Sequence, residues 1–140
     1  MALVVTAATL AVVAPADAAA RRVSVYHRSE NNKCLDVANY VSTTTCSGAS
    51  GQQWTINPNS IGETTFVNYQ TGLCLDSNSA GDVYAISCNG GAYQRWYLAG
   101  TGGRQIRNAA TERCLDGTGG NVITSRCNDL ASSQAWTING

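Results

Sequence analysis

Two short motifs recur three times in this chain of 140 residues, and their spacing constrains the fold more than any other feature. Each copy begins with Cys-Leu-Asp and ends with Gln-x-Trp. The first cysteines are 40 residues apart and the tryptophans are 42 and 40 apart; they are Cys34, Cys74 and Cys114, and Trp54, Trp96 and Trp136. A period of this length indicates one supersecondary unit repeated within a domain. We place the domain at residues 21–140, with repeats at about 21–58, 59–100 and 101–140.

The first twenty residues differ from the rest of the sequence. Residues 2–13 form an apolar run rich in Ala and Val, and Pro15 ends it. The small residues at 16–20 fit signal-peptidase cleavage, and the run is too short to span a bilayer. We therefore predict a secretory signal segment at residues 1–20 and a secreted mature protein, although no Lys or Arg precedes Arg21. The alternative is a disordered Ala-rich tail.

The six cysteines predict three disulfide bonds, because a short secreted chain with an even cysteine count is commonly cross-linked in this way. Six cysteines allow fifteen connectivities, but each repeat contains two of them. We predict the pairs Cys34–Cys46, Cys74–Cys88 and Cys114–Cys127. Each bond closes a short loop and stabilises the folded state by about 3 kcal/mol in the chain-entropy model. A zinc site is the alternative, and it lacks ligands: there is no Cys-x-x-Cys pair, and His27 is the only histidine.

Apolar residues at matched places in the three repeats predict one shared core. They lie eight residues before the first cysteine (Tyr26, Phe66, Ile106), five before the second (Val41, Val83, Val122) and two after the tryptophan (Ile56, Leu98, Ile138). Segments such as Trp-Thr-Ile alternate as strands do, and no segment has a sustained helical period. We predict an all-β protein of about twelve short strands, four per repeat, closed on itself because closure removes exposed strand edges.

The three units, each with Cys-Leu-Asp and an in-phase Gln-x-Trp, resemble the ricin-B-type lectin domain over about residues 23–140. This resemblance implies a β-trefoil fold and carbohydrate binding in shallow pockets, up to one per repeat, with no metal or other cofactor. The middle repeat is similar to the actinohivin-type lectins through Cys-Leu-Asp-Ser-Asn at 74–78, Gly-Asp-Val-Tyr at 81–84 and Cys-Asn-Gly-Gly-Ala-Tyr-Gln-Arg-Trp at 88–96. That similarity implies recognition of terminal α1,2-linked mannose on high-mannose glycans.

The middle repeat carries side chains suited to sugar binding. The resemblance places Asp76, Tyr84, Asn89 and Tyr93 at sugar-contacting positions and Ile86 near an apolar contact. The predicted disulfide supports this placement, because it brings the segments around Asp76 and Asn89 close together. A carboxylate accepts hydrogen bonds from sugar hydroxyls, an amide both donates and accepts, and an aromatic ring covers the apolar C–H face.

The outer repeats depart from this set. Neither has a tyrosine at the position of Tyr84 or Tyr93. The third repeat keeps Asp116 and Asn128 and is a weaker candidate site, whereas the first keeps only Asp36. Because the aspartate recurs in all three repeats, the alternative is that it only fixes a turn. By the same symmetry we expect the Gln and Trp of each Gln-x-Trp motif to be structural.

The sequence also narrows the class of function. No Ser-His-Asp set is supported around the single histidine, and the three repeated aspartates should lie far apart, so we predict no enzymatic activity. The mature chain has nine basic and eight acidic residues, a net charge of +1, which does not favour nucleic acid. No later stretch predicts a membrane helix. We expect a monomeric lectin that binds glycans or glycoproteins of the mannose type. The alternatives are a galactose- or xylan-binding module and a trefoil that binds or inhibits a protein without sugar.

Overall fold

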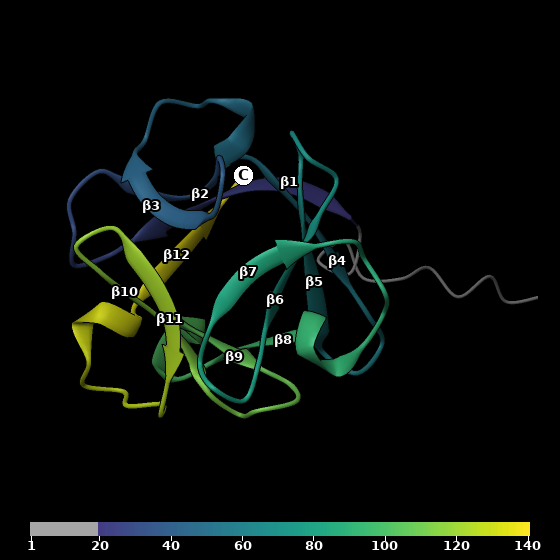
Figure 1. Cartoon of the computed structure of the whole chain (residues 1–140). Helices are drawn as coiled ribbons and strands as arrows, with labels where there is room; N and C mark the ends of the chain where they lie inside the picture. Colours follow the sequence, from purple (N-terminus) through teal and green to yellow (C-terminus); the bar gives the residue numbers. More distant parts are fainter. Residues whose placement is uncertain (1–19) are drawn as a thin grey trace, which may run out of the picture.

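The computed structural model describes residues 20–140, so the predicted signal segment lies outside the described residues except for Ala20. Four strands come from each repeat (Figure 1). They are β1 (Arg21–His27), β2 (Lys33–Val37), β3 (Val41–Thr45), β4 (Trp54–Pro58), β5 (Glu63–Asn68), β6 (Cys74–Ser77), β7 (Val83–Ile86), β8 (Trp96–Ala99), β9 (Gln105–Asn108), β10 (Cys114–Thr118), β11 (Asn121–Ser125) and β12 (Trp136–Asn139). The remaining elements are the 3₁₀ turns η2 (Ser50–Gln52), η3 (Ala92–Gln94), η4 (Thr101–Gly103) and η5 (Ser132–Gln134). The prediction of an all-β chain with twelve strands is confirmed for residues 20–140.

Six of the strands form a closed ring. β1 pairs with β12 and β4, β5 pairs with β4 and β8, and β8 pairs with β9, all antiparallel. The backbone N–H of Trp136 donates to the carbonyl of Arg104 at 2.8 Å, which joins β12 to the start of β9 and closes the ring. The other six strands form the hairpins β2–β3, β6–β7 and β10–β11. Each ring strand therefore has a neighbour on both sides, and this protects its backbone groups.

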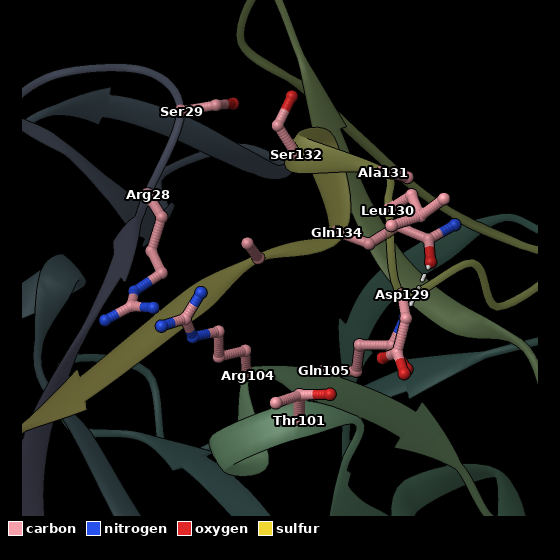
Figure 2. A pocket seen from close by; sticks show the side chains of 11 residues that line it. Arg28, Ser29, Thr101, Arg104, Gln105, Asp129, Leu130, Ala131, Ser132 and Gln134 are labelled. Carbon is pink, nitrogen blue, oxygen red and sulfur yellow. Dashed lines mark hydrogen bonds between the residues drawn. The ribbon is translucent and has the colours of Figure 1, made fainter.

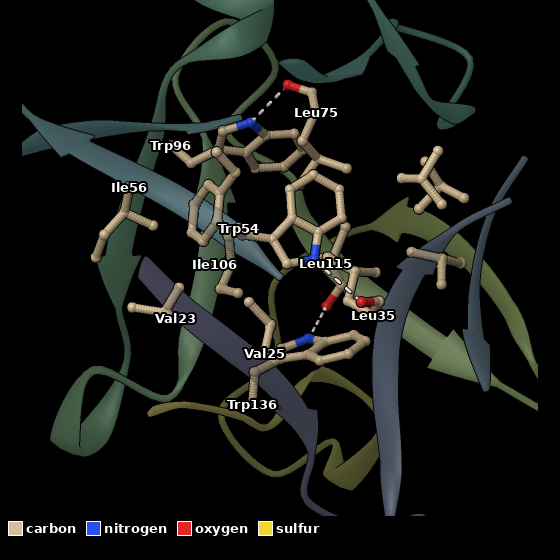
Figure 3. Packing of buried hydrophobic residues seen from close by; sticks show 14 residues of the cluster. Val23, Val25, Leu35, Trp54, Ile56, Leu75, Trp96, Ile106, Leu115 and Trp136 are labelled. Carbon is tan, nitrogen blue, oxygen red and sulfur yellow. Dashed lines mark hydrogen bonds between the residues drawn. The ribbon is translucent and has the colours of Figure 1, made fainter. Parts of the chain in front are cut away.

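The three tryptophans form the centre of the core (Figure 3). Each indole N–H donates to the carbonyl of the leucine in the Cys-Leu-Asp motif of its own repeat, at 3.0, 3.1 and 2.9 Å for Trp54, Trp96 and Trp136. A buried N–H without a partner would cost about 1–3 kcal/mol. The two sequence motifs of each repeat are thus tied together by one repeated bond, and the structural role predicted for the tryptophans is confirmed.

All three predicted disulfide bonds are present: Cys34–Cys46, Cys74–Cys88 and Cys114–Cys127. Each one joins the first strand of a hairpin to the segment that follows its second strand. The bond therefore holds the start of the hairpin against the loop that leads to the Gln-x-Trp motif.

Two predicted core positions are wrong. Tyr26 is only half-buried, and Val25 takes its place in the core. The first repeat has one more residue between its first two strands than the second: His27 and Asn68 both lie opposite a core tryptophan, but His27 precedes the next cysteine by seven residues and Asn68 by six. Leu98 is the other exception, because it is nearly half exposed on β8.

Candidate functional site

The hairpin of β6 and β7 places the first two predicted site residues opposite each other. Asp76 is the direct cross-strand partner of Tyr84, and Ile86 is the partner of Cys74. Side chains two residues apart on a strand share a face, so Tyr84 and Ile86 lie on the same face of the hairpin. Ile86 is 42% exposed and Asp76 is 3% exposed. The carboxylate is therefore recessed, while the isoleucine lies at the surface.

The glutamine of the Gln-x-Trp motif holds the Asp76 carboxylate in place. The side-chain N–H groups of Gln94 donate to Oδ2 of Asp76 at 2.8 Å and to the carbonyl of Ser87 at 3.0 Å. Its side-chain oxygen accepts the backbone N–H of Asn89 at 2.8 Å. Gln94 is fully buried, and it thus connects two predicted site residues. The structural role predicted for Gln94 is confirmed; that it binds Asp76 directly was not predicted, although both residues recur in every repeat.

The same Gln–Asp bond occurs in the outer repeats, but there a hydroxyl group also binds the carboxylate. Gln52 donates to Asp36 at 3.2 Å, and Thr44 donates to the same oxygen at 2.5 Å. In the third repeat the hydroxyl of Ser125 and the amide of Gln134 both donate to Oδ2 of Asp116.

Ile86 occupies the corresponding position in the middle repeat. Thr44, Ser125 and Ile86 are each paired with the first cysteine of their own repeat. Isoleucine has no hydrogen to donate. Gln94 donates to the Asp76 side chain, but no hydroxyl at this position joins it as in the outer repeats.

Tyr84 is a partly buried phenol held beside the carboxylate. Its hydroxyl donates to the carbonyl of Ser77 at 3.2 Å. Burial raises the pKa of Tyr84 above its usual value of 10.0. The negative charge of Asp76 and hydrogen bonding of the phenol to that carboxylate raise the pKa further, with contributions from Asp82 and Tyr93. The phenol is therefore a protonated hydrogen-bond donor at neutral pH. Asp82, which was not among the predicted site residues, also acts on Tyr84 through its charge.

Tyr93 and Asn89 lie on the segment that joins the hairpin to β8. Tyr93, in η3, is 46% exposed, and its carbonyl accepts a hydrogen bond from Nδ2 of Asn108 at 2.8 Å, which anchors the turn to β9. Oδ1 of Asn89 accepts the backbone N–H of Gly91 at 2.8 Å and so fixes a local turn. Within residues 20–140, Nδ2 of Asn89 has no hydrogen-bond partner, and it remains available as a donor.

These contacts bring four predicted residues together around Gln94 in the middle repeat: Asp76, Tyr84, Asn89 and Tyr93. Ile86 lies at the edge of the group, opposite the disulfide cysteine of β6. The group combines a recessed carboxylate, a phenol, a free amide donor and an exposed ring. Such a set can bind hydroxyl groups and one apolar face of a small polar ligand.

The weaker candidate site in the third repeat has a different form. Asp116 lies opposite Ile123 and lines a hollow of about 310 Å³ with Thr118 and Asn121. The backbone of Asn128 binds Gln134 at 2.8 Å, as Asn89 binds Gln94. This hollow has no aromatic wall, because Ile123 stands where the middle repeat has a tyrosine.

The residues that the structure describes contain no cluster of three or more His, Cys, Asp or Glu side chains arranged to hold a metal ion. No helix among residues 20–140 is of the length and apolarity that a membrane crossing requires.

Solved structures with the same fold include a designed threefold-symmetric protein, ThreeFoil (24% identity, TM-score 0.76, 85% of this chain and 98% of that one). The lectin SeviL, bound to asialo-GM1 saccharide, is 16% identical with a TM-score of 0.71 over 84% of this chain and 94% of that one. A mosquitocidal holotoxin is 20% identical with a TM-score of 0.76 over 85% of this chain, but the match spans only 17% of the toxin.

The fold predicted from the three repeats, an all-β β-trefoil, is confirmed by these likenesses. The model of the ricin-type beta-trefoil lectin domain matches residues 21–136. The chain therefore belongs to the ricin-type β-trefoil lectin domain family.

Proposed function

We propose that this protein is a secreted, non-enzymatic lectin that binds mannose-type glycans ending in α1,2-linked mannose, mainly through its middle repeat. The proposed ligand-binding residues are Asp76, Tyr84, Asn89 and Tyr93, with Ile86 as an apolar contact and Asp116 and Asn128 as a weaker site. Secretion is supported by the three disulfide bonds, which persist in oxidising compartments.

The observation that carries the proposal is the hydrogen-bonding state of the three equivalent carboxylates. Asp36 and Asp116 each accept the hydroxyl of the residue opposite the first cysteine, Thr44 or Ser125, whereas Ile86 leaves Asp76 without that donor. A ligand hydroxyl can occupy the place that Thr44 and Ser125 occupy in the outer repeats. Hydrogen bonds to charged acceptors are worth about 1.5–3 kcal/mol, so this acceptor would dominate the recognition of a polar ligand.

The neighbouring groups fit a sugar with vicinal hydroxyls. The free Nδ2 of Asn89 donates to one hydroxyl, and the phenol of Tyr84 reaches another. The ring of Tyr93 is exposed and supplies an apolar face for ring C–H groups. Neither tyrosine has an aromatic equivalent in the outer repeats, so the common core does not require them.

A single small polar site on a monomer binds weakly, because avidity across several sites is absent. We expect a dissociation constant of about 0.1–1 mM for a monovalent mannoside, which corresponds to about 4–5.5 kcal/mol.

The test compares Asp76→Ala with the matched variant Asp36→Ala. Each removes an acceptor from a buried glutamine, so both should lose a similar stability, about 1–3 kcal/mol. Only Asp76→Ala should abolish binding of α1,2-mannobiose, followed by titration calorimetry or by chemical shifts. Tyr93→Ala, at an exposed site, provides a variant that leaves the core intact and should also weaken binding.

Circular dichroism and thermal unfolding establish that each variant is folded before binding is compared. Retained mannobiose binding by folded Asp76→Ala would place the site elsewhere. Equal loss of binding in both aspartate variants would show that the aspartate acts only through the fold. Binding of galactose or xylan oligosaccharides in preference to mannobiose would overturn the specificity.

A further inference from the structure

A hollow of about 560 Å³ lies between the first and third repeats, away from the hairpin of Asp76 and Tyr84 (Figure 2). Its walls come from the loop after β1, the start of β9 with η4, and the segment around η5. The lining residues are Arg28, Ser29, Thr101, Arg104, Gln105, Asp129, Leu130, Ala131, Ser132, Gln134 and Ala135. This volume is in the range of small-ligand sites, about 300–1,000 Å³.

Two guanidinium groups face this hollow without a carboxylate partner. Arg28 and Arg104 extend to the same side of it (Figure 2). Arg28 donates through Nε to the hydroxyl of Thr137 at 2.7 Å. The only ion pair among the described residues is that of Arg95 with Glu63, so neither arginine is neutralised by an acid within residues 20–140.

The internal repeat shows why this hollow is open. The equivalent junction between the second and third repeats holds Arg95 and Glu63, which form an ion pair at 3.1 Å. The backbone N–H of Arg28 donates to the carbonyl of Ala135, and the backbone N–H of Ala109 donates to the carbonyl of Arg95 in the same way. Ala135 is therefore the equivalent of Arg95, and its side chain cannot form an ion pair.

The residue equivalent to Glu63 is also uncharged at this junction. The carbonyl of Arg104 accepts the backbone N–H of Trp136, and Thr64 is paired with Trp96 at the same place in the second repeat. Arg104 is therefore equivalent to Thr64, and the residue before it, Gly103, is equivalent to Glu63. At the junction of the first and second repeats, the ring of Tyr69 is covered by the guanidinium of Arg22, 3.6 Å from its centroid. At the junction of the third and first repeats, Arg28 and Arg104 therefore have no ion pair and no aromatic ring against them within the described part of the chain, and Asp129, the acid in the lining, forms no ion pair with either.

We infer that this hollow is a second binding site, for an acidic saccharide that carries a carboxylate. Guanidinium groups bind carboxylates in a forked, charge-assisted geometry. Asp129 on another wall accepts hydrogen bonds from sugar hydroxyls but repels a compact, multiply charged anion such as phosphate. Leu130 is 93% exposed at the rim and offers an apolar contact for ring C–H groups.

The test uses methyl β-D-glucuronide and its neutral counterpart, methyl β-D-glucoside, titrated into the mature ¹⁵N-labelled protein. The glucuronide should shift the amide signals of residues 28–29 and 101–105, and the glucoside should not. Arg104→Gln and Arg28→Gln should each weaken glucuronide binding about tenfold, the loss expected for one charge-assisted bond. Arg126→Gln, an equal charge change at an exposed arginine outside the hollow, should have no effect.

Thr101→Glu adds an acid to the hollow at an exposed position and should abolish glucuronide binding while both arginines remain. Asp76→Ala should bind glucuronide like the unmodified protein, so failure of the mannose site and failure of this site are distinguishable. Absence of shifts around Arg28 and Arg104, or equal weakening by Arg126→Gln, would overturn the inference. So would binding of inorganic phosphate as tight as that of glucuronide, because the hollow would then select charge and not a sugar acid.

Discussion

The substitution Ile86→Thr tests the role assigned to the Asp76 carboxylate most directly. It would give the middle repeat the hydroxyl that both outer repeats already have. Thr44, at the equivalent position, donates to Asp36 at 2.5 Å. The backbone register of the two hairpins is the same, because Ile86 pairs with Cys74 as Thr44 pairs with Cys34. The introduced hydroxyl is therefore expected to bind Oδ2 of Asp76.

The magnitude follows from the competition between this internal hydroxyl and a ligand hydroxyl. A hydrogen bond to a charged acceptor contributes about 1.5–3 kcal/mol, and about 1.4 kcal/mol is a tenfold change in affinity. Mannobiose binding should weaken about tenfold or more. The unfolding free energy should change by only about 1 kcal/mol, because the burial lost from the 42% exposed Ile86 is offset by the new bond.

The assay is a titration of α1,2-mannobiose followed by ¹H–¹⁵N chemical shifts, which measures millimolar dissociation constants. Ile61→Thr is the matched control, since Ile61 is 70% exposed in the turn between β4 and β5. It should bind like the unmodified protein. If Ile86→Thr keeps full affinity while a structure shows its hydroxyl on Asp76, the carboxylate is not the ligand acceptor and the reasoning fails.

Two further predictions concern stability. Replacing Cys74 and Cys88 together by serine should lower the free energy of unfolding by about 3 kcal/mol in urea titrations, and an unchanged midpoint would show that the loop is held by other contacts. The side-chain hydrogen bond from Asn59, aided by Arg95, lowers the pKa of Glu63 below its usual 4.5. The stability gained from ionised Glu63 is present above pH 4.5 and is lost as the pH falls through the lowered value. Glu63→Gln should therefore flatten the acid limb of the stability profile below pH 4.5, and an unaltered limb would refute the assignment.

The architecture was predictable because the same motifs, Cys-Leu-Asp and Gln-x-Trp, recur at matched positions in all three repeats. The period of about 40 residues predicted one unit used three times, and the paired cysteines predicted the three bonds now observed. Trp54, Trp96 and Trp136 were predicted as core residues from their symmetry and from the apolar residue two positions after each. The contacts behind that symmetry, from each indole to a leucine carbonyl, join segments 19 to 21 residues apart and are not visible in a sequence pattern.

The alignment of the first repeat was wrong at the position where it has a histidine and the other two repeats have an asparagine. His27 stands where the other repeats have Asn68 and Asn108. Its Nδ1 accepts the backbone N–H of Glu30 at 3.1 Å, so its Nε2 carries the proton that binds the carbonyl of Ser133 at 2.9 Å. An imidazole thus reproduces the donor and acceptor of an amide. Counting from the next cysteine could not find this match, because the first repeat is one residue longer there.

The candidate site was only partly predictable, since its decisive feature is a missing partner. The resemblance to the actinohivin-type lectins pointed to Asp76, Tyr84, Asn89 and Tyr93, and the four occur together only in the middle repeat. What distinguishes Asp76 is that Ile86 cannot supply the hydroxyl that Thr44 and Ser125 give to the outer carboxylates. The hydroxyl of Thr44 or Ser125 became meaningful only when the hairpin register placed it beside the acid.

Differences between equivalent positions therefore separate folding from binding in this molecule. The Trp–Leu and Gln–Asp hydrogen bonds occur in all three repeats, so removing one should destabilise whichever repeat loses it. A residue that serves binding alone, unlike Asp76, should instead be dispensable for stability, because the other repeats fold without it. Tyr93 and Arg104 meet this condition: their equivalents include Ser133 and Thr64, and both side chains are substantially exposed. Substituting either one should change the affinity for a saccharide and leave the unfolding free energy nearly constant, which is the opposite of what Gln94→Leu should do.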